Sequence, residues 1–168
     1  AFTYAGQVCI SVQRLFVHEN LYDAFMPKLL AGAAALRVGD PLDPTTDVGP
    51  MVDQNAASRT GRWVGEAVAM GGKVLLGGKA DGNFFPPTVL TDVPVHAQVC
   101  SNEAFAPLVI VFPYRELGDA IRQVNDSFFG LQTGVFTNDL DHAWRAYHEL
   151  EVGGVIVNDV PTYRIEHM

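Results

Sequence analysis

The second half of the sequence alternates short apolar runs with helical stretches, and this order limits the folds open to the chain. Residues 108–112 (LVIVF) form a continuous apolar run, which is typical of a parallel strand covered on both faces. The elements that follow are a helix at 117–124, a strand at 130–137, a helix at 139–150 capped by Asp139, and a strand at 154–158. Because short connections between such elements require right-handed crossovers, the order predicts one α/β domain with a parallel sheet.

The first half of the chain predicts further elements of the same kind. Residues 13–18 and 73–76 have the apolar and β-branched character of strands. Helices are expected at 21–36, with Asn20 as the N-cap, and at 54–70, where two glycines follow. The Pro-rich stretch 84–94 is interpreted as a bridge without regular structure.

The composition argues against several classes of partner. The net charge is −8, with 19 acidic and 11 basic residues and no Lys/Arg cluster, so a nucleic-acid partner is not expected. No apolar run reaches the roughly 18 residues that span a bilayer, and the start does not resemble a signal peptide. The two cysteines are not clustered with other metal ligands, so no metal site is predicted. These features favour a cytoplasmic protein without a membrane partner.

The segment around Cys9 has the residues that a thiol nucleophile requires. Such a thiol must be approachable, with small neighbours and backbone N–H groups near the oxyanion that it creates. Gly6 precedes Cys9 by three residues and Ser11 follows it by two. The segment alone also fits a second interpretation, in which Cys9 is a small buried apolar residue.

Glu103 and Phe105 form the second candidate site, just before the apolar run at 108–112. Two residues that are two apart point to the same side of an extended chain. At the C-terminal edge of a sheet, such a pair would hold a ribose through its hydroxyls and cover a flat ring. The alternative is a solvated Glu beside a core Phe. Cys100, nearby, is interpreted as a packing residue.

Taken together, these segments resemble the aldehyde dehydrogenase superfamily over the whole chain. The matching segments occur in the family's order: GQVC, VGDP, DVGPMV, GGK with LLGG, FFPPTVL, NEAFAPLVIVF, GLQTGVFTNDL and GGVIVND. The resemblance implies a parallel-sheet three-layer catalytic domain that works with NAD or NADP. It departs from the family at Ala106, where many members have Gly.

The resemblance also implies roles for single residues. Cys9 matches the thiolate that attacks the aldehyde to form a thiohemiacetal, which becomes a thioester when hydride leaves. Glu103 matches the carboxylate that holds the nicotinamide ribose, and Phe105 the aromatic ring beside it. Because both sites would serve one nicotinamide, Cys9 and Glu103 are expected to face a common cleft, at the edge where the strands' C-termini point.

By the same resemblance, residues 1–168 are one catalytic domain, excised from a longer parent that is a homo-oligomer. The dinucleotide-binding domain, the water-activating Glu and the oxyanion-binding Asn would all lie before residue 1. Losing even one oxyanion donor costs about 10²–10³ in rate. The isolated chain is therefore expected to have no dehydrogenase activity.

The C-terminal run resembles that of members acting on small aldehydes, where this loop lines the substrate mouth. Arg164 would then pair with an anionic substituent of the substrate, and His167 would act beside it. The alternative is a surface Arg that pairs with Glu166.

Three other functions compete with a hydrolytic aldehyde dehydrogenase. A CoA-acylating relative would pass the acyl group to CoA, and a non-enzymatic protein would retain only the fold. A cysteine–histidine hydrolase would pair Cys9 with His18, which must then lie within about 3 Å of the proton that it abstracts.

Overall fold

The computed structural model describes residues 1–162. The chain divides into two compact units, Ala1–Pro113 and Tyr114–Met168. Two clusters of buried apolar side chains lie in the first unit and one lies in the second. Each unit therefore has a core of its own.

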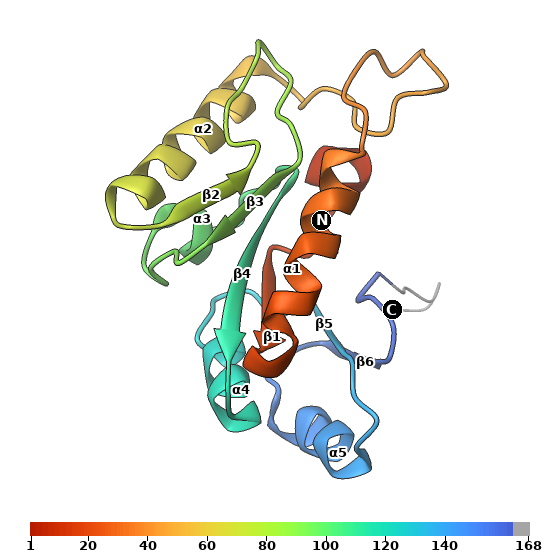
Figure 1. Cartoon of the computed structure of the whole chain (residues 1–168), viewed down its shortest axis with the longest axis vertical. Coiled ribbons are helices and arrows are strands. Elements are labelled where there is room, and N and C mark those ends of the chain that lie inside the picture. The colour runs from red at the N-terminus through yellow and green to blue at the C-terminus, as the bar shows by residue number, and fades with distance from the viewer. Residues whose placement is uncertain (163–168) are drawn as a thin grey trace. The chain divides into compact units, whose positions relative to one another are not determined.

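The first unit is built on a four-stranded sheet (Figure 1). Its strands, in spatial order, are β1 (Arg14–His18), β4 (Leu108–Tyr114), β3 (Thr88–Thr91) and β2 (Lys73–Leu76). β3 pairs with β4 in parallel, whereas β2 pairs with β3 antiparallel. All four residues of β3 are buried, as expected for a strand with a neighbour on each side.

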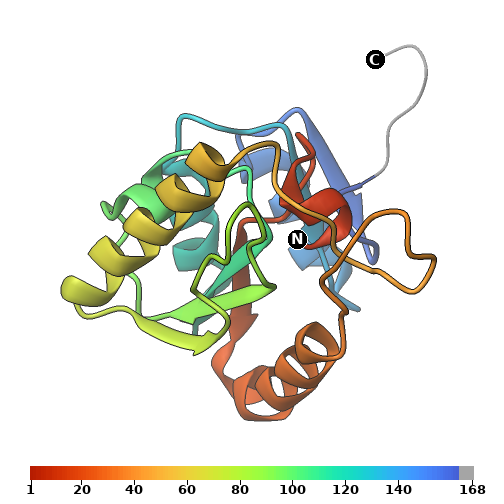
Figure 2. The same ribbon diagram turned by 90° about the horizontal axis from the view of Figure 1, so that it is seen from above.

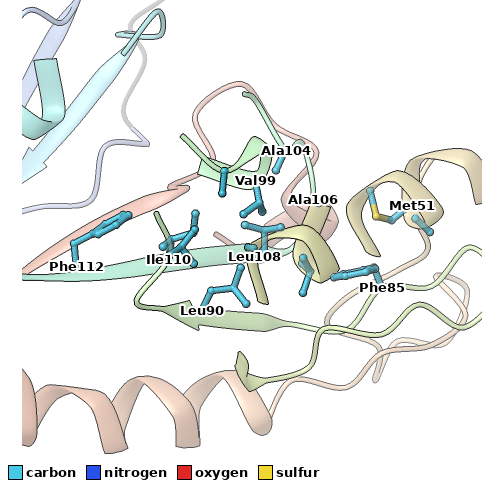
Figure 3. Packing of buried hydrophobic residues seen from close by; sticks show 14 residues of the cluster. Met51, Phe85, Leu90, Val99, Ala104, Ala106, Leu108, Ile110 and Phe112 are labelled. Atoms are coloured by element: carbon cyan, nitrogen blue, oxygen red, sulfur yellow. The ribbon is translucent and has the colours of Figure 1, made fainter. Parts of the chain in front are cut away.

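Helices cover both faces of this sheet. Alternate residues of β3 and β4 point to opposite faces, and each set packs against a different group of helices. Leu90 and Ile110 pack in the cluster that includes α2 (Gln54–Ala69) and α3 (Gln98–Ser101), as Figure 3 shows. Val89, Val109 and Val111 instead pack with residues of α1 (Glu19–Ala34). Figure 2 shows α1 and α2 as well-separated helices around the strands. The first unit is thus a three-layer α/β structure.

The second unit has a smaller sheet of two parallel strands, β5 (Gln132–Val135) and β6 (Gly154–Val157). Its helices are α4 (Leu117–Asn125) and α5 (Leu140–Glu149). Ile121, Ala146 and Leu150 form its buried core. The parallel pairing follows from the α5 crossover that separates the two strands.

The predicted α/β class with parallel strands is confirmed, but the strands predicted at 108–112, 130–137 and 154–158 do not share one sheet. β5 and β6 form a sheet of their own, and β2 runs antiparallel to β3. The sequence interpretation also missed β3, which lies inside the Pro-rich stretch 84–94. Its four residues directly follow Pro86 and Pro87, so the strand is too short for its apolar run to stand out from a turn-rich segment.

The helix starts show one confirmed prediction and one wrong one. Asp139 caps α5, because its side chain accepts hydrogen bonds from the backbone N–H groups of Asp141 and His142. Asn20 is not the cap of α1. The helix begins at Glu19, two residues earlier than predicted, and His18 Nδ1 accepts a hydrogen bond of 3.2 Å from the Asn20 N–H. An imidazole nitrogen can therefore replace the expected side-chain oxygen.

No helix within residues 1–162 is long and apolar enough to cross a membrane. In the same range, no three His, Cys, Asp or Glu side chains gather as a metal ion would require.

Candidate active site

A tight turn precedes Cys9. The short 3₁₀ helix η1 (Thr3–Gly6) contains Tyr4 and Ala5 at φ values of 52° and 55°, followed by Gly6 at 68°. The left-handed region costs an ordinary L-residue about 1–2 kcal/mol, so such a run persists only where its surroundings hold it. Ala5 is 1% exposed, so its methyl group anchors the turn in the protein interior.

Gly6 brings the Cys9 segment into direct contact with the Glu103 segment. A Cβ atom added at Gly6 would lie 1.9 Å from the Ala106 carbonyl oxygen and 2.7 Å from Pro107 N. No side chain fits in that space. The glycine is required both for its positive φ and for this close approach of two backbones.

Cys9 is exposed and opens on a hollow of about 20 Å³. The hollow is also lined by Glu103 and Phe105, which are far from Cys9 in the sequence. This volume suits about one water molecule, so a larger ligand would lie across the mouth of the hollow. The structure therefore brings the two predicted segments together at one place in the first unit.

The Glu103 side chain is exposed and available to a ligand. No described residue donates a hydrogen bond to its carboxylate or forms an ion pair with it. Phe105, which is half-buried, has a left-handed backbone with φ of 48°. The turn thus presents an unpaired carboxylate next to a partly exposed aromatic ring.

The Glu103 turn does not lie at the sheet edge that the sequence interpretation expected. It leads into the first residue of β4, and the Thr88 N–H at the start of β3 donates to the Pro107 carbonyl. Since β3 and β4 are parallel, this turn lies at their N-terminal ends. The rule that ligands bind at C-terminal strand edges concerns loops that follow strands, whereas this turn precedes one.

Two residues that the sequence interpretation missed hold the Glu103 turn by its backbone. Gln13 lies just before β1, and its Oε1 accepts a 2.9 Å hydrogen bond from the Ala104 N–H. Arg59, on α2, donates from Nη2 to the Ala104 carbonyl at 2.8 Å. Neither residue belongs to a motif, and both are distant from the turn in the sequence, so no local pattern could have identified them.

Cys100 differs from Cys9 in its surroundings. It lies on α3, half-buried against the large core cluster of the first unit. Burial raises the pKa of the Cys100 thiol, and nearby Arg14 opposes that shift. The packing role predicted for this cysteine agrees with its position.

The remaining candidate residues do not join this site in the structure. His18 caps α1 and does not line the Cys9 hollow, so nothing places it as a base for a hydrolase. Arg164 and His167, the predicted substrate-binding pair, lie outside the described residues. Ala106, the departure from the family pattern, is 3% exposed and packs in the core cluster.

Comparisons with known proteins show the family to which the chain belongs. The model of the aldehyde dehydrogenase family matches residues 1–168. The 3-sulfolactaldehyde dehydrogenase of Priestia megaterium is 52% identical over all 168 residues, which cover 35% of that protein. The chain therefore spans about a third of the length of this curated relative.

Two solved structures have closely similar folds. The first is aldehyde dehydrogenase 21 from Physcomitrella patens, in complex with its reaction product succinate. It is 43% identical with a TM-score of 0.95, and the match covers 98% of this chain and 34% of that one. The second is the glyceraldehyde-3-phosphate dehydrogenase of Methanocaldococcus jannaschii in complex with NADP. It is 40% identical with a TM-score of 0.94, over 99% of this chain and 36% of that one. The chain belongs to the aldehyde dehydrogenase family.

Proposed function

We propose that this chain supplies the nucleophile and part of the cofactor site of an NAD(P)-dependent aldehyde dehydrogenase. The observation that carries the proposal is the shared hollow, on which the exposed Cys9 and the unpaired Glu103 both open. Without this juxtaposition, a reactive thiol and a ribose-binding carboxylate could not serve one cofactor.

The residues around the hollow fit a nicotinamide riboside. A free carboxylate accepts hydrogen bonds from ribose hydroxyls, and a half-exposed aromatic ring covers a flat ligand. Glu103 and Phe105 would hold this part of NAD or NADP, and the bound cofactor would supply the hydride acceptor. The complex of the Methanocaldococcus relative with NADP supports this class of cofactor.

Cys9 performs the covalent chemistry in this proposal. Its thiolate attacks the aldehyde carbon, and the carbonyl oxygen becomes the oxyanion of a thiohemiacetal. The Cys9 backbone N–H has no acceptor within the described part of the chain, so it is free to bind that oxyanion. Loss of hydride from the same carbon leaves a thioester on Cys9, which water then cleaves to release the carboxylic acid.

The proposed substrate is a short aldehyde with an anionic end. The named compounds of the three relatives support this class: 3-sulfolactaldehyde carries a sulfonate, succinate a carboxylate, and glyceraldehyde 3-phosphate a phosphate.

A hybrid enzyme tests the function directly. In it, these 168 residues replace the matching 35% of the Priestia 3-sulfolactaldehyde dehydrogenase, which supplies the rest of the protein. The expected result is NADH or NADPH formation that depends on an anionic short aldehyde. A hybrid that folds, yet oxidises no aldehyde, would contradict the proposal.

The isolated chain of 168 residues is expected to form no measurable NADH or NADPH from any aldehyde. It spans only about a third of the curated relative's length. The measurement is the absorbance of NADH or NADPH after the isolated chain is mixed with the cofactor and the same aldehydes as for the hybrid. Turnover by the isolated chain would place the whole active site inside these residues.

Cys9 is expected to react with iodoacetamide at least about tenfold faster than Cys100 in the folded chain. Cys9 is exposed, whereas burial raises the pKa of Cys100 and so lowers its thiolate fraction near neutral pH. Peptide mass spectrometry after short labelling times measures the two rates. The Cys9→Ser variant should lose the fast phase, and faster labelling of Cys100 would reverse the assignment.

A further inference from the structure

We propose that Gln13 and Arg59 are positioning residues that hold Glu103 at the hollow by clamping the backbone of its turn. This inference rests on the proposed function, because it assigns the clamp a role in placing the cofactor-binding carboxylate. Ala104, the residue after Glu103, is held at both of its backbone polar groups. Its N–H donates to Gln13 Oε1 at 2.9 Å, and its carbonyl accepts from Arg59 Nη2 at 2.8 Å.

Gln13 also holds the chain before Glu103. Its Nε2 donates to the Asn102 carbonyl at 2.7 Å and to the Val99 carbonyl at 2.8 Å. One amide side chain thus contacts the backbone on both sides of Glu103. Because a side-chain amide has two donors and an acceptor, only Asn or Gln can make this set of bonds, and Asn is one methylene shorter.

Arg59 is itself held in place by its neighbours. Its guanidinium lies over the Trp63 ring, 5.1 Å from the ring centroid. Its Nε is buried and has no hydrogen-bond partner within the described residues. A stacked guanidinium whose main hydrogen bond goes to one backbone carbonyl is suited to fixing that carbonyl's direction.

The turn contains a strained backbone conformation, so it depends on contacts that hold it in place. Phe105 has φ of 48°, a left-handed conformation that persists only where surrounding contacts impose it. The Glu103 carboxylate has no partner among the described residues, so only the backbone sets its position. Gln13 also lines the hollow with Cys9. The clamp therefore ties the carboxylate to the segment that carries the thiol.

Amide hydrogen exchange on the full 168-residue chain tests the clamp without any nucleotide. In Gln13→Leu, the Ala104 N–H is expected to exchange roughly fivefold to tenfold faster, since one net hydrogen bond is lost. Arg59→Met should accelerate the same amide. The Val109 and Val111 amides in β4, neither of which donates to Gln13, should keep their wild-type rates. Gln54→Leu, a change of an exposed glutamine on α2, is the matched control and should alter neither set.

A double-mutant cycle in the hybrid enzyme tests the role in cofactor binding. Gln13→Leu and Glu103→Gln are each expected to raise the KM for NAD(P) by about fivefold or more. Together they should raise it little further, because Gln13 acts through Glu103. The inference is overturned if the two substitutions raise the KM for NAD(P) by fully additive amounts. It is also overturned if Gln13→Leu speeds amide exchange throughout β4, because Gln13 would then only stabilise the fold. An inactive wild-type hybrid would refute the proposed function, and the Ala104 exchange rate would still decide whether the clamp exists.

Discussion

Replacing Cys9 with serine is expected to lower the aldehyde-oxidising rate of the hybrid enzyme by roughly 10³-fold or more. A hydroxyl is a much weaker acid than a thiol, so serine at this position is a far poorer source of the ionised nucleophile. The substitution replaces an exposed sulfur with a smaller oxygen, which creates no steric clash, so the surrounding turn should keep its shape. Steady-state kcat/KM with a short anionic aldehyde measures the loss.

Cys100→Ser is the matched control for this experiment. That thiol lies on α3 against the core cluster and does not line the Cys9 hollow. Its replacement should cost some stability, because it buries a hydroxyl, but should leave most of the rate. A Cys9→Ser enzyme that retains wild-type kcat/KM would remove Cys9 from the mechanism, whatever the outcome for Cys100.

Gly6→Ala is expected to lower the free energy of unfolding of the first unit by about 3 kcal/mol or more. The new methyl group would meet the Ala106 carbonyl oxygen at 1.9 Å, and the obstacle is backbone that has no flexible end to move. The positive φ at Gly6 adds strain for any residue with a side chain. Urea unfolding followed by Trp63 fluorescence, in a Trp144→Phe background, reports on the first unit alone.

Two other glycines of the same unit serve as controls. Gly32 in α1 and Gly65 in α2 have no atom within 4 Å of an added Cβ. Alanine at either position should raise the free energy of unfolding by about 0.5–1 kcal/mol, as in an ordinary helix. A neutral Gly6→Ala substitution would mean that the Cys9 and Glu103 segments do not approach each other as closely as described.

The sequence predicted those parts of the fold whose signals are local. The continuous run at 108–112 became β4, and Asp139 capped α5 because both depend on neighbouring residues alone. The two separate sheets could not be predicted in this way, because strand pairing is decided by packing between distant segments. β3 was missed for a different reason. It is fully buried but only four residues long, so its sequence shows no periodic pattern that would distinguish a strand within the Pro-rich stretch.

The residues of the candidate site also differ in whether a local sequence pattern could identify them. Cys9, Glu103 and Phe105 occur in segments with a recognisable order, so the sequence could single them out. Gln13 and Arg59 bond to the backbone of Ala104, which is 91 and 45 residues away, respectively. Bonds of this kind depend on where the chain folds back, and a lone glutamine or arginine carries no sign of them. The expected sheet edge was wrong because the turn precedes its strand rather than following it.

The segment between Gly6 and Gln13 is fixed at both ends. Gly6 is pressed against the Ala106 backbone, and Gln13 is bonded to the chain on either side of Glu103. Residues 7–12, which include Cys9, must therefore span a fixed distance between Gly6 and Gln13. Homologous sequences should therefore keep Cys9 and the length of this stretch constant, even where its other residues differ in type. A single insertion or deletion here would move the sulfur out of register with the carboxylate while leaving every strand of the sheet intact.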